Sequence, residues 1–262
     1  MNNFPILPFC RTNLENFTFK LIKEIPKNSQ ILHITVNGYK VKISFEKINN
    51  NLICFGKYKN YLCTIEETEE ITNEFHHLMG TKLSEDIRTI CGIGISFLNW
   101  HKKTKFCSNC GNILDFSKNE NIAKFCNNCK SMYFPTLTPA IIIAVTKNKS
   151  LLVTRKAEWK GKRYGLVAGF IEYGENIEES AIREVFEETG IKIKNIKYIA
   201  SQFWPFPYQL MIGLTADYQD GDIVVDKLEL EEAKWIKFRD LTDDLLPPPS
   251  SIAYFLMKHT IK

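Results

Sequence analysis

Residues 169–191 read GFIEYGENIEESAIREVFEETGI, a segment rich in glutamate. The middle of this segment predicts a single helix. Asn176 can cap the first turn, Glu179 completes a reciprocal capping pattern, and Gly190 supplies the left-handed residue that ends the helix. The segment therefore predicts a loop, a helix and a second loop in close succession.

The predicted helix has an acidic side and an apolar side. At about 100° per residue, Glu187 and Glu188 both lie within about 60° of Glu184, one on each side of it. The apolar residues occupy another side and are expected to face a core: Ile177, Ala181, Ile182, Val185 and Phe186. Clustered carboxylates repel one another, but hard oxygen ligands on one ridge suit Mg²⁺ or Mn²⁺. On charge alone, a metal site and an ordinary solvated acidic face both stay open, and Glu178 and Glu179 fit a solvated first turn.

Two apolar runs precede the acidic segment. Residues 140–145 read AIIIAV and lie between Pro139 and polar residues, which predicts a strand buried on both faces. Residues 151–154 read LLVT and are the expected hairpin partner.

Four of the eight cysteines form two close pairs, Cys107 with Cys110 and Cys126 with Cys129. Two residues between cysteines let one tight turn aim both sulfurs at one point, so two such turns predict a tetrahedral structural zinc site. A fragment of about 23 residues has too little apolar area to fold without that metal. All four positions are filled by sulfur, so this zinc is not expected to be catalytic. A redox pair or buried thiols are the alternatives, but one redox motif leaves the second pair unexplained.

The first part of the chain is predicted to be rich in strands. Residues 31–36 and 39–45 alternate between apolar and polar types or nearly so, and the asparagines at 49–51 and the pair Lys59-Asn60 predict turns. A connecting helix is predicted to begin at Ser84, with apolar residues on one face up to Trp100. His101, Lys102 and Lys103 are expected to be solvated cations at the end of that helix.

The 262 residues are 44% hydrophobic and 24% charged, with a formal net charge of +4. This composition is typical of a folded protein and excludes collagen, coiled coils and low-complexity tails. The charge is too small for nucleic acid recognition by a global field, so any site for a polyanion must be local. No run approaches the roughly 20 apolar residues of a membrane helix, and the N-terminus lacks a secretory signal. We therefore expect a cytoplasmic protein without a membrane partner.

Residues 201–207 read SQFWPFP, in which prolines separate large aromatic residues. Such a loop is stiff and offers flat apolar faces on which bases and nicotinamide rings stack. A loop that packs in the core is the alternative interpretation.

The spacing within residues 169–191 resembles the full signature of the Nudix hydrolases, carried by Gly169, Glu175 and the run REVFEETGI from Arg183. The resemblance implies an α+β fold, namely an α/β/α sandwich with a mixed sheet whose loop-helix-loop holds metal ions. It also implies hydrolysis of a nucleoside diphosphate linked to another moiety.

The same resemblance gives roles to individual residues. The implied catalytic residues are Glu188, Glu184, Glu187, Arg183 and Glu175. Glu184 and Glu188 would bind Mg²⁺ or Mn²⁺ together with the carbonyl of Ala168, while Arg183 would pair with Glu175. A water activated by the metal would attack phosphorus, and Glu188 would accept or position its proton.

The aromatic loop narrows the resemblance to one branch. SQFWPFP is similar to the Ser-Gln-Pro-Trp-Pro-Phe-Pro mark of the NADH pyrophosphatases, which also carry a four-cysteine zinc ribbon and an N-terminal domain. This branch implies cleavage of NADH or NAD to nicotinamide mononucleotide and AMP, removal of NAD caps from RNA 5′ ends, and a homodimer. The implied substrate-binding residues are Phe170, Gln202, Phe203, Trp204, Pro205, Phe206, Pro207, Tyr208, Gln209, Phe134, Glu120 and Ala253, and Glu229 is an implied further metal ligand.

The sequence departs from this branch at three positions. Phe203 replaces a proline, Gln209 stands where serine is frequent, and Phe134 stands where tyrosine is usual. Tyr133 is expected to compensate for the hydroxyl missing at Phe134. The departures bear on the choice among dinucleotides more than on the reaction.

Two rival functions remain. One is a Nudix enzyme for ADP-ribose or diadenosine polyphosphates, since all such enzymes share the metal helix. The other is a nucleotide-sensing or RNA-binding protein with an inert hydrolase fold, which has no need for three intact glutamates. In either case the predicted organisation is a β-rich domain at 1–83, a connecting helix at 84–105, a zinc ribbon at 106–135 and a Nudix domain at 136–262.

Overall fold

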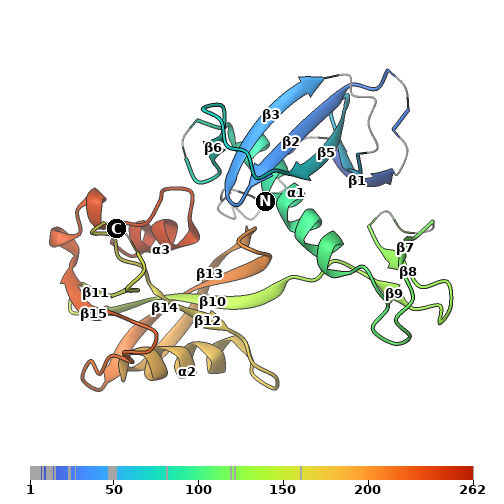
Figure 1. Cartoon of the computed structure of the whole chain (residues 1–262). Coiled ribbons are helices and arrows are strands. Elements are labelled where there is room, and N and C mark those ends of the chain that lie inside the picture. Colours follow the sequence, from blue (N-terminus) through green and yellow to red (C-terminus); the bar gives the residue numbers. More distant parts are fainter. Residues whose placement is uncertain are drawn as a thin grey trace. The chain divides into compact units, whose positions relative to one another are not determined.

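The computed structural model describes residues 7, 9, 14, 16–22, 25–26, 28–46, 52–80, 82–118, 120, 122–159 and 161–261. Their elements are labelled in Figure 1 and form two compact units. The C-terminal unit is built from residues 138–203 and 209–262, and the N-terminal unit from residues 8–137 and 204–208. No helix in the described part of the chain is long and apolar enough to cross a membrane. The finer division into four segments stays a prediction.

The C-terminal unit is built on a mixed sheet with strand order β13-β14-β10-β11-β15, and β12 also pairs with β10. The strands are β10 (Thr138–Lys147), β11 (Ser150–Arg155), β12 (Val167–Phe170), β13 (Lys192–Trp204), β14 (Gln209–Asp220) and β15 (Glu232–Lys237). β10 runs parallel to β14 from the pair Thr138↔Gln209 to the pair Thr146↔Asp217. It is antiparallel to β11 and β12. The hairpin predicted for residues 140–154 is therefore confirmed, with β10 in the interior of the sheet.

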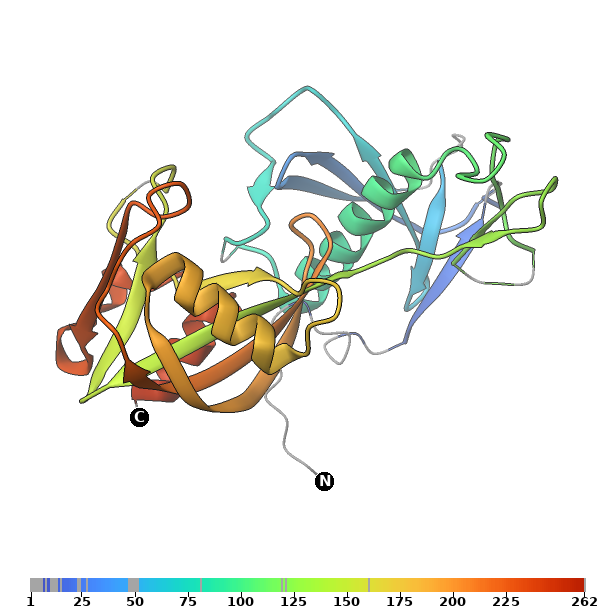
Figure 2. The same cartoon turned by 90° about the horizontal axis from the view of Figure 1, so that it is seen from below.

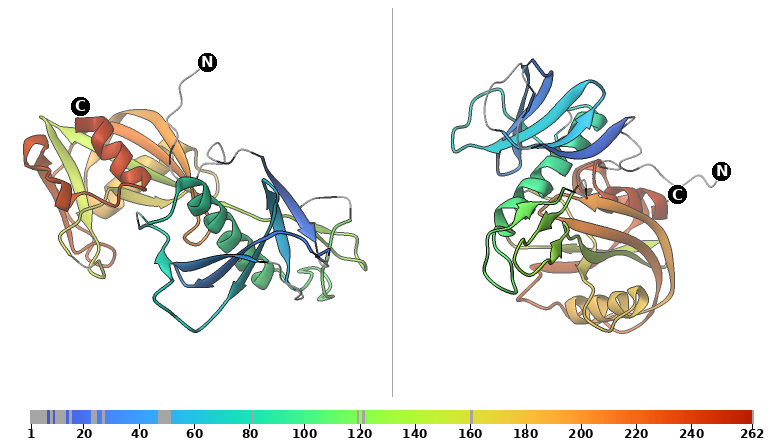
Figure 3. Two further views of the ribbon diagram at one scale, coloured as in Figure 1. Left: turned by 90° about the horizontal axis from the view of Figure 1, so that it is seen from above. Right: turned by 90° about the vertical axis from the view of Figure 1, so that its right-hand side faces the viewer.

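Helices cover both faces of this sheet. α2 (Ile177–Thr189) and α3 (Ile252–Ile261) lie on opposite sides of it, as the views in Figures 2 and 3 agree. Residues 140–145 are buried along their whole length because each face of β10 meets a helix. On the α2 side, Ile141 and Ile143 belong to the same core cluster as Ala181 and Val185. The predicted α/β/α sandwich is confirmed, together with the α+β class.

The ends of α2 are those that the sequence predicts. The side chain of Asn176 accepts a hydrogen bond from the Glu179 N–H at 2.8 Å, and the Glu179 carboxylate accepts one from the Asn176 N–H at 2.9 Å. Gly190 takes a left-handed conformation with φ of 71° and ends the helix. Its N–H donates to the carbonyl of Phe186.

The buried side of α2 differs from the prediction. Ile182 and Phe186 are 47% and 51% exposed, whereas Glu184 and Glu188 are only 9% and 3% exposed. The buried face of α2 contains Ser180, Ala181, Glu184, Val185 and Glu188, which recur every three or four residues. Both carboxylates therefore lie on the face that meets the sheet. The prediction was right for Ala181 and Val185 and wrong for Ile182 and Phe186, because it assigned the faces of the helix by polarity alone.

The N-terminal unit contains a second sheet, a helix and a small three-stranded sheet. Its larger sheet has the order β1-β4-β5-β2-β3-β6. The strands are β1 (Phe17–Ile22), β2 (Ile31–Asn37), β3 (Lys40–Glu46), β4 (Cys54–Tyr58), β5 (Tyr61–Glu67) and β6 (His76–His77). The runs at 31–36 and 39–45 and the turn at 59–60 are confirmed, while the turn predicted at 49–51 lies outside the described residues. The small sheet contains β7 (Asp115–Phe116), β8 (Lys124–Phe125) and β9 (Met132–Tyr133).

The connecting helix α1 (Glu85–Lys103) begins directly after Ser84, although the Ser84 side chain forms no cap hydrogen bond. Its last turn corrects the prediction for His101. The imidazole stacks against the rings of Phe97 and Phe116, at centroid distances of 5.8 and 5.3 Å. Burial, with help from the charges of Lys124 and Lys105, lowers the pKa of His101 to about 4, so this residue is neutral rather than a solvated cation.

A buried lysine joins α1 to the small sheet. Lys124 of β8 is 3% exposed, and its Nζ donates hydrogen bonds to the carbonyls of His101 and Thr104. These carbonyls belong to the end of α1, where no helical N–H remains to satisfy them. The ammonium also lies 5.3 Å from the centre of the Trp100 ring.

Candidate functional site

Arg183 connects α2 to the loop before it. Its guanidinium donates Nε to Glu175 Oε1 at 2.5 Å and Nη2 to Glu175 Oε2 at 3.0 Å, which is the expected pair. Nη1 donates to Glu184 Oε1 at 2.9 Å and to Glu187 Oε2 at 3.0 Å, and Nη2 also donates to the carbonyl of Phe170 at 2.9 Å. All five N–H donors of a guanidinium thus have acceptors. The hydrogen bonds from Arg183 hold the pKa of Glu175 at about 2.

The carboxylate of Glu184 lies directly against strand β12. A Cβ placed on Gly169 would come within 1.9 Å of Glu184 Cδ and 2.0 Å of its Oε1. Only glycine leaves room for a carboxylate in this position. Burial raises the pKa of Glu184, and Arg183 partly offsets the increase. Ala168, the expected carbonyl ligand, precedes Gly169 on the same strand, opposite Ile142.

Glu188 is buried without a compensating partner. Among the described residues, neither of its carboxylate oxygens has a hydrogen-bond acceptor or donor within reach. Burial raises its pKa to about 8, and Glu184, Glu229 and Asp226 add to that increase, while Lys156 opposes it. A buried carboxylate without a partner is costly unless a cation binds it. Glu184 and Glu188 therefore offer hard oxygen atoms that suit a divalent ion, while the role of Glu229 as a further ligand stays a prediction.

Two residues beside Glu188 were missed by the sequence analysis. Asp226 raises the pKa of Glu188 through its charge, and its N–H donates to the Glu188 carbonyl at 3.1 Å. Lys156 is the cation whose charge acts on Glu188. Both lie in loops remote in sequence and carry no motif. The only available signal was that Asp226 is an acidic residue close to Glu229.

The four paired cysteines converge as predicted. Their sulfur atoms all lie within 4.8 Å of one another. The Sγ–Sγ distances are 3.3 Å for Cys107 and Cys129, 3.5 Å for Cys110 and Cys126, and 3.9 Å for Cys110 and Cys129. A tetrahedron with metal–sulfur bonds of about 2.3 Å has edges of about 3.8 Å. The cluster therefore has the size required to hold a metal ion.

The aromatic loop packs against other rings of the N-terminal unit. Trp204 and Phe206 contact each other at a centroid distance of 5.0 Å, and Phe9 lies 6.2 and 6.1 Å from them. Tyr39 meets Phe206 edge-on at 4.6 Å, and Pro205 is buried. These contacts stabilise the loop, so the stacking role of its rings toward a substrate stays a prediction.

Gln202 is fully buried, and its role in lining a substrate pocket stays a prediction. Its amide Nε2 donates to the Ser250 carbonyl at 3.0 Å, and its Oε1 accepts from the Ile252 N–H at 2.7 Å. Gln202 therefore fixes the start of α3.

The remaining predicted substrate residues lie in both units. Phe170 and Phe134 have 50% and 52% exposed side chains that are available for stacking. Tyr133 does not compensate for Phe134, because its hydroxyl contacts Cys107 at 3.1 Å and Ser108. In the C-terminal unit lie Phe170, Phe203, Gln209 and Ala253; in the N-terminal unit lie Glu120, Phe134, Pro207 and Tyr208.

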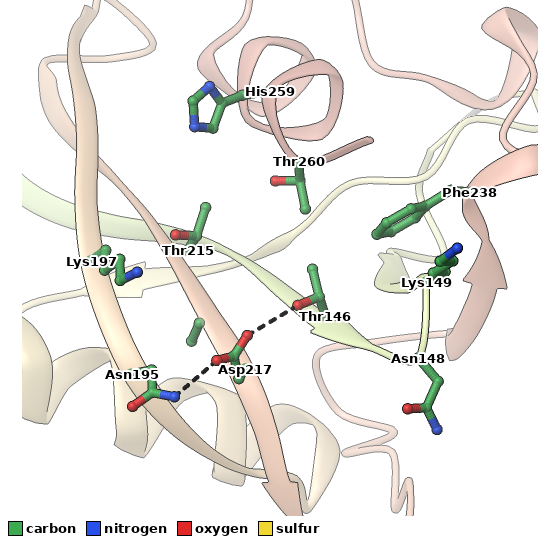
Figure 4. A pocket seen from close by; sticks show the side chains of 11 residues that line it. Thr146, Asn148, Lys149, Asn195, Lys197, Thr215, Asp217, Phe238, His259 and Thr260 are labelled. Carbon is green, nitrogen blue, oxygen red and sulfur yellow. Dashed lines mark hydrogen bonds between the residues drawn. The ribbon is translucent and has the colours of Figure 1, made fainter. Parts of the chain in front are cut away.

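A surface pocket of about 340 Å³ lies elsewhere in the C-terminal unit, beside the end of α3. Figure 4 shows its polar lining, in which Asp217 is held by Thr146 at 3.4 Å and Asn195 at 2.9 Å. None of the predicted site residues lines this pocket. The chemistry of the carboxylates on α2, rather than cavity size, identifies the candidate site.

Known proteins are similar to this chain in sequence and in fold. Residues 136–255 match the model of the NUDIX domain. The NAD-capped RNA hydrolase NudC of Klebsiella pneumoniae (strain 342) is 36% identical over 224 residues, which cover 84% of each chain. The NAD-capped RNA hydrolase NudC of Enterobacter sp. (strain 638) is 41% identical over 172 residues, 66% of each chain. A crystal structure of a NUDIX hydrolase from Nitrosomonas europaea is similar in fold, with a TM-score of 0.52 at 21% identity over 60% of this chain and 90% of that one.

The matched region includes both the buried carboxylates of α2 and the arginine that organises them. The chain belongs to the Nudix hydrolase family, in the branch that contains these NAD-capped RNA hydrolase relatives.

Proposed function

We propose that this protein hydrolyses the pyrophosphate of NADH and NAD to nicotinamide mononucleotide and AMP, and that it removes NAD caps from RNA 5′ ends. The observation that carries the proposal is the buried Glu184–Glu188 pair on α2, with both oxygens of Glu188 unpaired among the described residues. The relatives named NAD-capped RNA hydrolase supply the substrate class.

Glu184, Glu188, Glu229 and the carbonyl of Ala168 would hold Mg²⁺ or Mn²⁺. When bound, such an ion neutralises the pyrophosphate and makes a water molecule more acidic. Side chains of the protein would then orient this water molecule and accept its proton. Glu188 is the candidate acceptor, because it is a buried carboxylate on the metal-binding ridge and no described residue hydrogen-bonds its oxygens. Arg183 positions Glu184 and Glu187 through the hydrogen bonds already described.

The other assignments have different support. The four-cysteine cluster is proposed to hold a structural zinc ion, since its dimensions suit one. Phe170 and Phe134 are proposed to stack on the rings of the substrate, with residues of the aromatic loop, Glu120 and Ala253 as further contacts. A homodimer is proposed from the branch resemblance alone, and the cytoplasmic location is proposed from the sequence features described above.

The direct test measures products from NADH, NAD and ADP-ribose by chromatography, with Mg²⁺ or Mn²⁺ present. We expect AMP and nicotinamide mononucleotide from the first two. Glu188→Gln is expected to lose most of the rate, on the order of a 100-fold or larger decrease in kcat, without unfolding. Glu178→Gln is the matched control, because Glu178 is an exposed first-turn residue of the same helix.

Full activity in Glu188→Gln would remove the role assigned to that residue. Hydrolysis of ADP-ribose with no turnover of NADH or NAD would favour the rival Nudix activity. Comparing kcat/KM for free NADH with that for NAD-capped RNA then identifies the preferred substrate.

A further inference from the structure

Tyr133 connects the two cysteine turns. It ends strand β9, just after the turn that carries Cys126 and Cys129, and it reaches back to the first turn. Its hydroxyl oxygen lies 3.1 Å from Cys107 Sγ, 3.0 Å from the Ser108 N–H and 3.1 Å from Ser108 Oγ. One phenol thus contacts both a candidate metal ligand and the backbone next to it.

The direction of the hydrogen bond to Cys107 follows from the available donors. The Ser108 N–H can only donate, so it uses a lone pair of the Tyr133 hydroxyl and leaves the hydroxyl hydrogen for another acceptor. A metal-bound cysteine is a thiolate and can only accept. A hydrogen bond between Tyr133 and a metal-bound Cys107 must therefore run from the Tyr133 O–H to Sγ, with the Ser108 hydroxyl free to donate to the remaining lone pair of Tyr133.

Solvent has limited access to the sulfur end of this bond. Cys107 is only 3% exposed, whereas Cys110 and Cys129 are exposed. A water molecule could hydrogen-bond to an exposed sulfur after loss of a neighbour, but it has little access to Cys107. Hydrogen bonds from groups around a metal site orient its ligands and raise metal affinity.

We propose that Tyr133 is a positioning residue of the four-cysteine site: its hydroxyl hydrogen-bonds the Cys107 thiolate and slows release of the zinc ion. The proposal rests on the assignment of zinc to the cysteine cluster, and it is independent of the hydrolytic reaction. It also gives the hydroxyl a function that excludes the predicted compensation for Phe134.

The test compares full-length wild type with Tyr133→Phe, which removes only the hydroxyl. Zinc content is first measured by atomic absorption, and zinc release into a colorimetric chelator is then followed over time. We expect one zinc per chain in wild type and release that is about 10- to 100-fold faster in Tyr133→Phe, because loss of such a hydrogen bond lowers metal affinity by about that factor. Tyr61→Phe is the matched control, because Tyr61 lies on β5 and packs its ring against Phe45.

A spectroscopic measurement separates a bond to sulfur from a general loosening of the fold. In cobalt-substituted protein, loss of a hydrogen bond to a thiolate is expected to move the sulfur-to-metal charge-transfer band to longer wavelength. Ser108→Ala is expected to leave the band in place, because the Ser108 backbone N–H still supports the hydroxyl.

Equal release rates and an unshifted band in Tyr133→Phe, with one zinc per chain, would overturn the role of Tyr133 while leaving the zinc site intact. Wild-type protein purified without zinc, and unable to take it up, would overturn the zinc assignment and this inference together. Neither outcome affects the proposed hydrolysis, which is assayed separately.

Discussion

Glu184 can occupy its position only because residue 169 is a glycine and has no side chain. The Glu184 carboxylate occupies the volume that a Cβ would fill, with 1.9 Å between Glu184 Cδ and that Cβ. We expect Gly169→Ala to displace this carboxylate and to lower kcat/KM by about 10- to 1,000-fold, because metal ligands must be held within a fraction of an ångström. Stability should change by only about 1 kcal/mol, since the displaced group is the end of a flexible side chain. The measurements are steady-state kinetics and urea unfolding. Wild-type kinetics in Gly169→Ala would mean that Glu184 tolerates another position.

Glu188 should destabilise the metal-free protein at high pH. Its pKa is raised to about 8 in the folded protein, above the value of 4.5 for an unburied glutamate. The folded state therefore holds the proton more tightly, so stability is greatest below pH 4.5 for this group and is lost as pH rises through 8. We expect Glu188→Gln to be more stable than wild type at about pH 9 without added Mg²⁺ or Mn²⁺, by about 1–3 kcal/mol.

Urea unfolding at acidic and alkaline pH measures this difference. Because the glutamine is neutral at every pH, the advantage of Glu188→Gln should shrink toward acidic pH. Adding Mn²⁺ should reverse the order by stabilising wild type alone. An advantage that does not vary with pH would contradict a buried, titrating Glu188.

At the scale of elements, the packing of α1 against β8 depends on the side chain of one lysine. Lys124 satisfies two carbonyls at the end of α1 and is buried there. We expect Lys124→Met to destabilise the protein by about 1–3 kcal/mol, because the buried carbonyls lose their donors while the apolar volume is kept. Thermal unfolding provides the measurement. Lys118→Met is the control, since Lys118 is exposed in the same small sheet region.

The sequence predicted the elements that carry local signals. The bounds of α2 follow from Asn176, Glu179 and Gly190, whose capping geometry depends on neighbours in the chain. The buried face of α2 was predicted correctly for Ala181 and Val185 but missed Glu184, which is buried because β12 offers Gly169, a contact made across the fold. Polarity along a helix is a poor guide where polar residues are buried for function.

For single residues too, the sequence does not reveal contacts made with distant parts of the chain. The motif identified Glu184, Glu188 and the pair Arg183–Glu175, because a signature fixes their spacing. Lys124 reads as one more surface lysine in sequence, since the carbonyls that it satisfies lie more than 15 residues earlier. Neither spacing nor composition reveals such a contact.

At the scale of the whole molecule, the cysteine cluster should affect one unit more than the other. All four cysteines belong to the N-terminal unit, while the carboxylates of α2 belong to the C-terminal unit. We expect removal of zinc to lower the melting temperature of the N-terminal unit by about 10 °C or more, because metal binding supplies folding free energy to so small a sheet. Calorimetry before and after chelation, with zinc content verified, is the measurement. Unchanged melting after complete removal would contradict a structural metal.

The parallel pairing of β10 with β14 has a consequence for synthesis on the ribosome. β10 is made first, but the strand that pairs with it from Thr138 to Thr146 ends its contacts at Asp217, some 70 residues later in translation. Until β14 has been synthesised, one edge of the very apolar strand β10 has no neighbour, and such an edge promotes aggregation. The nascent polypeptide therefore completes the acidic helix before its central strand is protected, which makes this interval the period when chaperones matter most.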